Sequence, residues 1–283
     1  MSRIKPTFLS RALLAGLIAL VAQSAHAQAV APAPVPSPKP ADIHARITEN
    51  AVDSSVPDDP EVEKMLQPYA PRVRALNEVI GTLKGELRKG GIGAGSLGNF
   101  VADALRDRAQ VKIGKPILLA ITNSGGLRKS AIAEGELRAG DIFELLPFEN
   151  ALVTVELTGE QLRRFLDVIL KNRDAQSGAR ITYRANDKKE NESVSVKLGS
   201  SGNEFEIDPK ATYTIATIDY LVKRGGDYAI LQEGKNLQAL GLTIRDAVLD
   251  YVKSETAAGR PIKSTLDGRF RSDKPQSETE KPE

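Results

Sequence analysis

The sequence predicts an α+β domain, and three observations lead to that prediction. Residues 117–122 (ILLAIT) form a short continuous apolar run, which is typical of a strand buried on both faces. Thr158-Gly-Glu-Gln161 is a capping box that opens a helix with one apolar face. Helical and strand patterns do not alternate strictly after residue 150, which favours α+β over a doubly wound parallel sheet.

The first half of the domain is expected to contain helices on either side of a glycine-rich turn. Ser96 is expected to cap a helix that continues to about Gln110. The elements expected before it are a helix over 61–76 strained by two prolines, a strand over 79–87 and the glycine-rich turn over 90–98.

The second half is expected to contain further strands and two capped helices. The capping box at Thr158 opens a helix to Lys171, and Thr243-x-x-Asp246 opens the last helix. The strands are expected at 151–157, 180–184, 192–198 and 211–217.

Composition argues against several classes of function. The chain has 39 Lys and Arg against 37 Asp and Glu, so no basic excess predicts nucleic acid as a partner. The absence of cysteine from the sequence excludes disulfides, a thiolate nucleophile, zinc–cysteine clusters and iron–sulfur clusters. With two histidines, His26 and His44, no metal site and no catalytic residue is predicted.

The glycine-rich turn contains one motif that needs a separate interpretation. Gly93-Ala-Gly95-Ser-Leu-Gly98 matches the spacing of a dinucleotide-binding loop. The next strand ends in Thr122-Asn123 instead of the acidic residue that would bind a ribose hydroxyl. We therefore interpret the motif as a flexible turn that leads into a helix.

Residues 1–27 have the layout of a cleavable secretory signal peptide. Positive residues precede an apolar run at 12–22, and Ala25-His26-Ala27 has the small-x-small pattern of a signal-peptidase site. We expect cleavage after Ala27, a periplasmic or secreted protein, and no membrane attachment after cleavage. The alternative is an uncleaved membrane anchor.

The rest of the chain is expected to hold one domain between two segments without regular structure. Residues 28–60 contain seven of the 16 prolines, which is typical of an extended linker. Residues 271–283 contain no large apolar side chain and are expected to be disordered. The domain is therefore expected to span residues 61–270.

The segment Asn123-Ser-Gly-Gly-Leu-Arg128 is a candidate ligand-binding loop. It follows a predicted buried strand directly, and the carboxyl edge of such strands is a common place for ligands. Gly125 and Gly126 would let backbone amides approach an anion, Asn123 offers a donor and an acceptor, and Arg128 suits a phosphate or carboxylate. The alternative is a tight turn with a solvated arginine.

Three further residues complete the candidate site. Phe148 and Tyr220 could hold a flat base between their rings, and Asp227 could accept hydrogen bonds from sugar hydroxyls. Taken singly, Phe148 is better explained as a core residue and Asp227 as a turn residue.

The order of four segments resembles the C-terminal domain of the 5'-nucleotidase / UDP-sugar hydrolase family over about residues 61–270. These segments are LGNFVADALR (97–106), ITNSGGLR (121–128), GELRAGDIFELLPFENALVTVELTGEQL (135–162) and DYLVKRGGDY (219–228). The resemblance implies a layered α/β/β/α domain with two sheets. In that family this domain binds the nucleotide, while a separate N-terminal metallophosphatase domain hydrolyses it.

The resemblance also implies roles for individual residues. Asn123 and Arg128 match positions that contact the nucleotide, Phe148 and Tyr220 match the two stacking aromatics, and Asp227 matches the sugar-binding aspartate. The sequence departs from the family pattern in three places. Residues 90–96 lack the charged side chains that are usual there, so Lys89 or Arg224 becomes a candidate phosphate contact. One residue is added between Tyr220 and Asp227, and Tyr228 replaces a frequent glycine.

The family's chemistry needs two metal ions held by several His, Asp and Asn residues, which this chain's two histidines do not supply. We therefore expect an exported stand-alone domain that binds a nucleotide or nucleoside in nucleotide catabolism, is not catalytic alone and has no cofactor of its own. One alternative is the substrate-binding subunit of a split phosphohydrolase, with divalent metals in a separate metallophosphatase chain. Another is a structural or interaction domain that has lost the pocket.

Overall fold

The computed structural model describes residues 48, 49 and 51–274. The chain divides into two units, Met1–Pro57 and Asp58–Glu283, and every described helix and strand lies in the second unit. The predicted signal peptide, His44 and residues 275–283 lie outside the described residues. Within the part that is described, no helix is both long and apolar enough to cross a membrane.

The central sheet has five strands in the order β12-β6-β11-β3-β7. These strands are β3 (Leu119–Thr122), β6 (Ala151–Thr158), β7 (Ala175–Ser177), β11 (Thr212–Ile218) and β12 (Lys235–Thr243). Strands β3 and β11 are parallel neighbours, whereas the other pairs are antiparallel. All four residues of β3 are buried, so the strand predicted from the apolar run is confirmed, with its start moved to Leu119.

A second sheet has four strands in the order β10-β9-β8-β14. They are β8 (Ala179–Ala185), β9 (Asn191–Ser200), β10 (Asn203–Glu206) and β14 (Phe270–Ser272). Strand β14 pairs in parallel with β8, with Arg271 opposite Thr182. The expectation that disorder begins at residue 271 was therefore wrong for the first two residues, because backbone pairing needs no large apolar side chain.

Two small sheets complete the strands. One has the order β13-β1-β5, made of β1 (Val79–Lys84), β5 (Gly135–Arg138) and β13 (Ile262–Lys263), and the other pairs β2 (Leu87–Arg88) with β4 (Ala131–Ile132). The single strand expected over 79–87 is thus two strands, because Gly85 takes a left-handed φ of 80° between them. The α+β class is confirmed, with the described strands arranged in four sheets.

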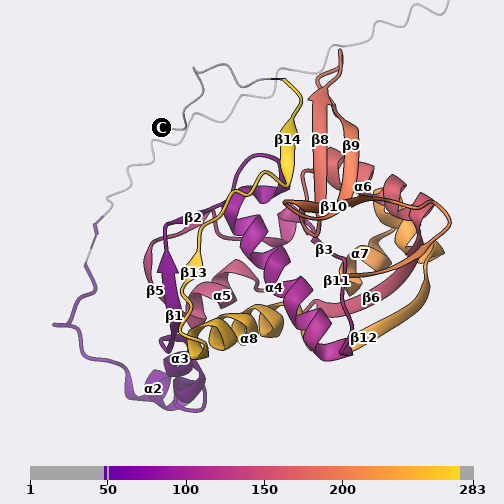
Figure 1. The fold of residues 1–283 in the computed structure, drawn as a ribbon. Coiled ribbons are helices and arrows are strands. Elements are labelled where there is room, and N and C mark those ends of the chain that lie inside the picture. The colour runs from indigo at the N-terminus through magenta and orange to yellow at the C-terminus, as the bar shows by residue number, and fades with distance from the viewer. Residues whose placement is uncertain (1–47, 50, 275–283) are drawn as a thin grey trace, which may run out of the picture. The chain divides into compact units, whose positions relative to one another are not determined.

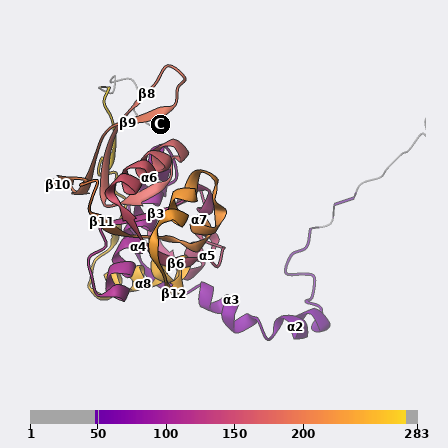
Figure 2. The same cartoon turned by 90° about the vertical axis from the view of Figure 1, so that its right-hand side faces the viewer.

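The helices that begin with capping boxes lie where the sequence predicted them. Helix α6 (Gly159–Asn172) begins after Thr158, whose Oγ1 accepts the N–H of Gln161, and α8 (Ile244–Ala257) begins after Thr243 in the same way. Figure 1 shows α4 (Gly95–Ile113) running across the centre of the domain toward α8, and α6 lies beside β9 there and in Figure 2.

Helix α4 begins differently from the prediction. Ala94 is the N-cap in a left-handed conformation, and Ser96 lies inside the first turn, where its Oγ accepts the N–H of Arg88 at 2.9 Å. A Cβ on Gly98 would lie 2.0 Å from the carbonyl oxygen of Gly93. Backbone packing therefore accounts for this glycine, in agreement with the interpretation of the motif as a turn that leads into a helix.

The helix expected over 61–76 is interrupted. It forms α2 (Pro60–Leu66) and α3 (Ala70–Leu76), and neither contains a buried residue. Pro68 lies between them, and proline both lacks the N–H of a continuing helix and disfavours helical geometry in the preceding residue. The remaining α-helices among the described residues are α5 (Ala139–Leu145) and α7 (Asp219–Arg224). Short 3₁₀ helices lie at Ile92–Ala94, Ser124–Gly126 and Gly226–Glu233.

Candidate functional site

The candidate site lies where β3 and β11 end. Because these strands are parallel, Asn123 after β3 and Asp219 after β11 emerge at the same edge of the central sheet. Asp219 Oδ1 accepts the N–H of Ala151 at 2.9 Å, which ties the start of α7 to the start of β6. This contact holds Tyr220 on α7 near the segment that carries Phe148.

Six of the seven residues predicted for the site line one pocket of about 360 Å³. Its lining consists of Asn123, Gly125, Gly126, Arg128, Phe148, Asn150, Tyr220 and Arg224. The seventh, Asp227, lines an adjoining cavity of about 390 Å³, which shares Asn123, Gly125 and Arg224 with the first. The fold thus brings the predicted residues together, and their roles in binding remain predictions.

The two aromatic side chains are placed in a pocket wall and not in the core. Phe148 is 48% exposed and Tyr220 is 40% exposed. The guanidinium carbon of Arg128 lies 5.9 Å from the centroid of the Phe148 ring, and that of Arg224 lies 5.8 Å from the Tyr220 centroid. Each ring therefore has an arginine within cation–π distance, so aromatic surface and positive charge occur together.

Gly126 makes room for Asn123, whereas a Cβ on Gly125 would lie at ordinary contact distance from it. A Cβ on Gly126 would lie 3.2 Å from Asn123 Oδ1, and one on Gly125 would lie 3.5 Å from Asn123 Nδ2. Asn123 Oδ1 is buried and has no hydrogen-bond partner among the described residues. Buried acceptors are usually paired, so this oxygen is suited to accept a hydrogen bond from a ligand.

The structure distinguishes between the two candidate phosphate contacts. Lys89 is absent from the pocket lining, and its Nζ donates to the carbonyl oxygen of Leu127 at 2.8 Å. Arg224 lines both cavities. Asp227, in the second cavity, has Oδ2 at 3.5 Å from Lys171 Nζ.

Sequence reasoning missed two residues at this site. Asn150 lines the pocket, and its signal was an amide two residues after a predicted stacking ring. Asp174 lines the second cavity and is 2% exposed. Burial raises its pKa to about 6, although hydrogen bonds from Tyr228 and Ser124 act in the opposite direction. No motif marked Asp174, because its partners lie far away in the sequence.

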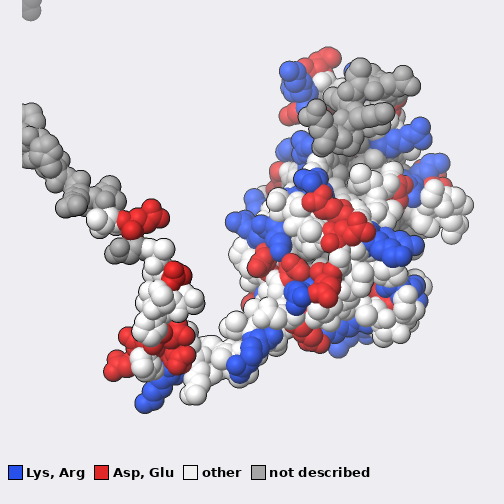
Figure 3. Space-filling model, turned by 90° about the vertical axis from the view of Figure 1, so that its left-hand side faces the viewer, with Lys and Arg blue, Asp and Glu red and all other residues white. Residues whose placement is uncertain are grey.

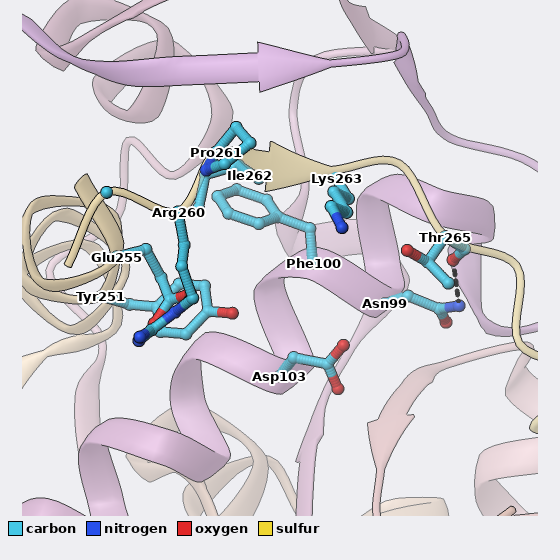
Figure 4. A pocket seen from close by; sticks show the side chains of 11 residues that line it. Asn99, Phe100, Asp103, Tyr251, Glu255, Arg260, Pro261, Ile262, Lys263 and Thr265 are labelled. Atoms are coloured by element: carbon cyan, nitrogen blue, oxygen red, sulfur yellow. Dashed lines mark hydrogen bonds and ion pairs between the residues drawn. The ribbon is translucent and has the colours of Figure 1, made fainter.

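A further cavity, of about 320 Å³, lies on another part of the domain between α4, α8 and β13 (Figure 4). Three of its four charged side chains are already paired within the protein, and Lys263 is the fourth. Asp103 pairs with Arg269, Glu255 pairs with Arg260, and Asn99 Nδ2 donates to the carbonyl of Thr265 at 2.9 Å. These side chains are committed to internal contacts, so this cavity is the weaker candidate for a ligand site.

Charge is distributed without a dominant sign on the visible face of the domain. Figure 3 shows Lys and Arg interspersed with Asp and Glu there. Within the described residues, no group of three or more His, Cys, Asp or Glu side chains is placed to hold a metal ion.

Comparisons with known proteins give consistent results. The chain is 27% identical over 233 residues to the trifunctional nucleotide phosphoesterase protein YfkN of Bacillus subtilis, covering 78% of this chain and 16% of that protein. It is 29% identical to endonuclease YhcR of the same organism, and the match covers 69% of this chain and 15% of that protein. The matched part is therefore a small fraction of these relatives.

Solved structures share the fold. The 5'-nucleotidase precursor from Thermus thermophilus matches with a TM-score of 0.63 at 24% identity, over 78% of this chain and 45% of that one. NAD nucleotidase from Haemophilus influenzae matches with a TM-score of 0.57 at 18% identity, over 76% of this chain and 42% of that one. The family described as "5'-nucleotidase, C-terminal domain" matches residues 79–233, a range that contains all seven predicted site residues. The chain belongs to the 5'-nucleotidase C-terminal domain family.

Proposed function

We propose that the pocket binds a nucleotide, with the base between the rings of Phe148 and Tyr220. The observation that carries this proposal is that two half-exposed aromatic rings from different segments line one pocket together with two amides, Asn123 and Asn150. Flat rings provide stacking surface for a base, and amides can pair with the edge of a base.

The charges of the pocket favour a nucleotide over a nucleoside. Arg128 and Arg224 line it, and no Asp or Glu is among the described residues of its lining. Guanidinium groups recognise phosphate through paired N–H donors. Asp227, in the adjoining cavity, is suited to accept hydrogen bonds from the ribose hydroxyls.

We further propose that this chain alone does not hydrolyse the nucleotide. The whole sequence has two histidines and no cysteine, a poor supply of ligands for the two metal ions that the family's hydrolytic chemistry needs. A separate metallophosphatase chain that uses this domain for substrate binding is the second candidate. It is favoured by the match to the 5'-nucleotidase C-terminal domain family, because the resemblance assigns the hydrolysis to a separate metallophosphatase domain. We also propose export, on the basis of residues 1–27.

Calorimetric titration of the mature protein tests the binding proposal. The ligands are AMP, adenosine, adenine and ribose 5-phosphate, with GMP, CMP and UMP to compare bases. We expect a nucleoside monophosphate to bind more tightly than the matching nucleoside, because only the former carries charge for Arg128 and Arg224. If no nucleotide or nucleoside binds, the domain is a structural or interaction module.

Phosphate release tests the proposal that the chain is not catalytic alone. The same protein is incubated with AMP and Zn²⁺, Mn²⁺ or Mg²⁺, and we expect no release above the buffer blank. Turnover that survives repurification and is lost on substitution of Arg128 would contradict this proposal.

A further inference from the structure

The carboxylate of Asp174 joins two chain segments beside the pocket. Asp174 lies between α6 and β7 and is buried. Its Oδ1 accepts the backbone N–H of Ser124 at 2.8 Å, and its Oδ2 accepts the hydroxyl hydrogen of Tyr228 at 2.5 Å. One side chain therefore contacts two segments that are far apart in the sequence.

Both segments carry residues of the proposed nucleotide site. Ser124 belongs to the loop from Asn123 to Arg128, and Tyr228 directly follows Asp227. The loop is held at its other end, where Arg128 N donates to the carbonyl of Leu145 at 2.9 Å. Among the hydrogen bonds of the described residues, those of Asp174 are the ones that connect the two segments.

The buried position of Asp174 makes its ionised carboxylate energetically unfavourable. Arg224 is the nearby cation that favours its ionised form, and Asp227 is a second carboxylate in the same cavity, beside Lys171. Arg173, the preceding residue, donates a hydrogen bond of 3.3 Å from Nε to the carbonyl oxygen of Gly91. Burial of a carboxylate is unfavourable, and its net effect is a raised pKa. An apolar residue would avoid this cost, so the hydrogen bonds of Asp174 call for an explanation.

We propose that Asp174 is a positioning residue that fixes the Asn123–Arg128 loop relative to Asp227, so that a ligand can contact both at once. This inference rests on the proposed nucleotide site. A ligand that reaches Arg128 with its phosphate and Asp227 with its ribose depends on the spacing between them, and preformed spacing reduces the ordering needed on binding. A free base is held mainly between Phe148 and Tyr220 and meets the loop only through Asn123, so it depends less on this spacing.

The binding test compares AMP with adenine in three variants. Asp174→Leu removes both hydrogen bonds and should weaken AMP about tenfold or more while weakening adenine clearly less. Asp174→Asn keeps an acceptor for Ser124 N–H and a donor toward the Tyr228 oxygen, so it should restore most AMP affinity. Tyr228→Phe removes one hydrogen bond and should give an intermediate loss, and it keeps the buried ring in case Asp174→Leu does not fold.

Two matched variants serve as controls. Asp167→Asn removes a carboxylate on α6 that is hydrogen-bonded to Ser193, outside both cavities. Tyr213→Phe removes the hydroxyl of a tyrosine on β11, and that hydroxyl accepts the N–H of Asp208 at 3.0 Å. Both should leave AMP affinity unchanged.

A ligand-free measurement separates this inference from the proposed function. In an NMR titration of the free protein, the Ser124 amide proton should shift with a midpoint near pH 6, because its acceptor is the Asp174 carboxylate, and the shift should vanish in Asp174→Asn. Hydrogen exchange at Gly125 and Gly126 should accelerate in Asp174→Leu and Tyr228→Phe but not in Tyr213→Phe.

The outcomes are distinct. If no nucleotide binds but exchange accelerates as described, the nucleotide site is wrong and Asp174 still positions the loop. If AMP binds and neither Asp174→Leu nor Tyr228→Phe changes AMP affinity or loop exchange, the positioning role is wrong. Equal losses of AMP and adenine in Asp174→Leu and Asp174→Asn would also overturn it, because they would indicate a role confined to general folding.

Discussion

Arg224 donates a hydrogen bond of 2.7 Å from Nη1 to the hydroxyl oxygen of Tyr220, and both side chains line the pocket. The guanidinium carbon also lies 5.8 Å from the centroid of the Tyr228 ring. These contacts restrict the Tyr220 ring before any ligand arrives, and a ring that is already ordered loses less rotamer freedom on binding. The positive charge of Arg224 remains open to an anion in either cavity.

The first prediction concerns this arginine. Arg224→Gln should weaken AMP by about 1 kcal/mol, or roughly fivefold, because the site is partly open to solvent and its charge interactions are screened. Adenosine should be affected less, since it carries no phosphate. Calorimetry on both ligands gives the comparison, with Arg88→Gln as the control because that exposed arginine pairs with Glu86 away from the pocket. Equal losses for AMP and adenosine would assign Arg224 to ring positioning alone.

The second prediction concerns the stability of the fold against pH. The pKa of Asp174 is about 6 in the folded protein, above its ordinary value of 3.8, so the folded state binds more protons than the unfolded state between these values. The contribution of Asp174 is therefore most favourable below about pH 4 and declines as pH rises to about 6, by roughly 3 kcal/mol in total.

Urea unfolding of the parent protein and Asp174→Asn at pH 4.5 and 7.5 measures this contribution. The parent should lose the stabilising contribution of Asp174 between pH 4.5 and pH 7.5, whereas the variant lacks the titrating group. The free energy of unfolding of the variant minus that of the parent should therefore be higher at pH 7.5 than at pH 4.5. The control is Asp167→Asn, because the carboxylate that it removes is half exposed instead of buried. A constant offset between parent and Asp174→Asn at both pH values would contradict the raised pKa.

The parts of the fold that sequence reasoning predicted well depend on neighbouring residues. Capping boxes at Thr158 and Thr243 involve residues three positions apart, so the starts of α6 and α8 could be identified without tertiary information. Ser96 shows the limit of such reasoning. Its hydroxyl looked like a helix cap, but its partner is the N–H of Arg88 in strand β2, which only the folded chain brings near.

The same distinction applies to the site. The loop from Asn123 to Arg128 could be placed at a strand edge because it directly follows an apolar run. Asp174 could not be predicted, since its two partners, Ser124 and Tyr228, come from distant segments. The sequence also could not decide between Lys89 and Arg224 as pocket residues, because their orientation depends on which backbone carbonyl or ring each one meets.

The third prediction concerns the glycine motif before α4. Gly98→Ala should lower the free energy of unfolding by about 1–3 kcal/mol, because its Cβ would meet the backbone of Gly93 and the helix would have to shift. AMP affinity should stay unchanged, since Gly98 lines neither cavity. Chemical denaturation and calorimetry measure the two effects, and Gly90→Ala is the control because nothing lies within 4 Å of its Cβ position. Loss of nucleotide binding without loss of stability would instead indicate a phosphate-binding loop.

The last prediction concerns the two rings. If the base lies between them, Phe148→Ala or Tyr220→Ala should each lose about 1–3 kcal/mol of stacking, which corresponds to a roughly 5- to 150-fold fall in affinity for AMP. Adenine should lose a similar factor, because the rings address the base and not the phosphate. The melting temperature of the free protein should change little, since Phe148 is 48% exposed and Tyr220 is 40% exposed.

Phe205→Ala is the matched control for this experiment, because that ring on β10 is similarly exposed and lies outside both cavities. It should leave affinity for AMP and adenine unchanged. The combined Phe148→Ala and Tyr220→Ala variant should lose less binding free energy than the sum of the two single losses. Each single variant already removes the arrangement in which both faces of the base are stacked, so the two effects are not independent. If Phe148→Ala unfolds the domain while the parent binds no nucleotide, the ring serves the fold, and the pocket would have no role in ligand binding.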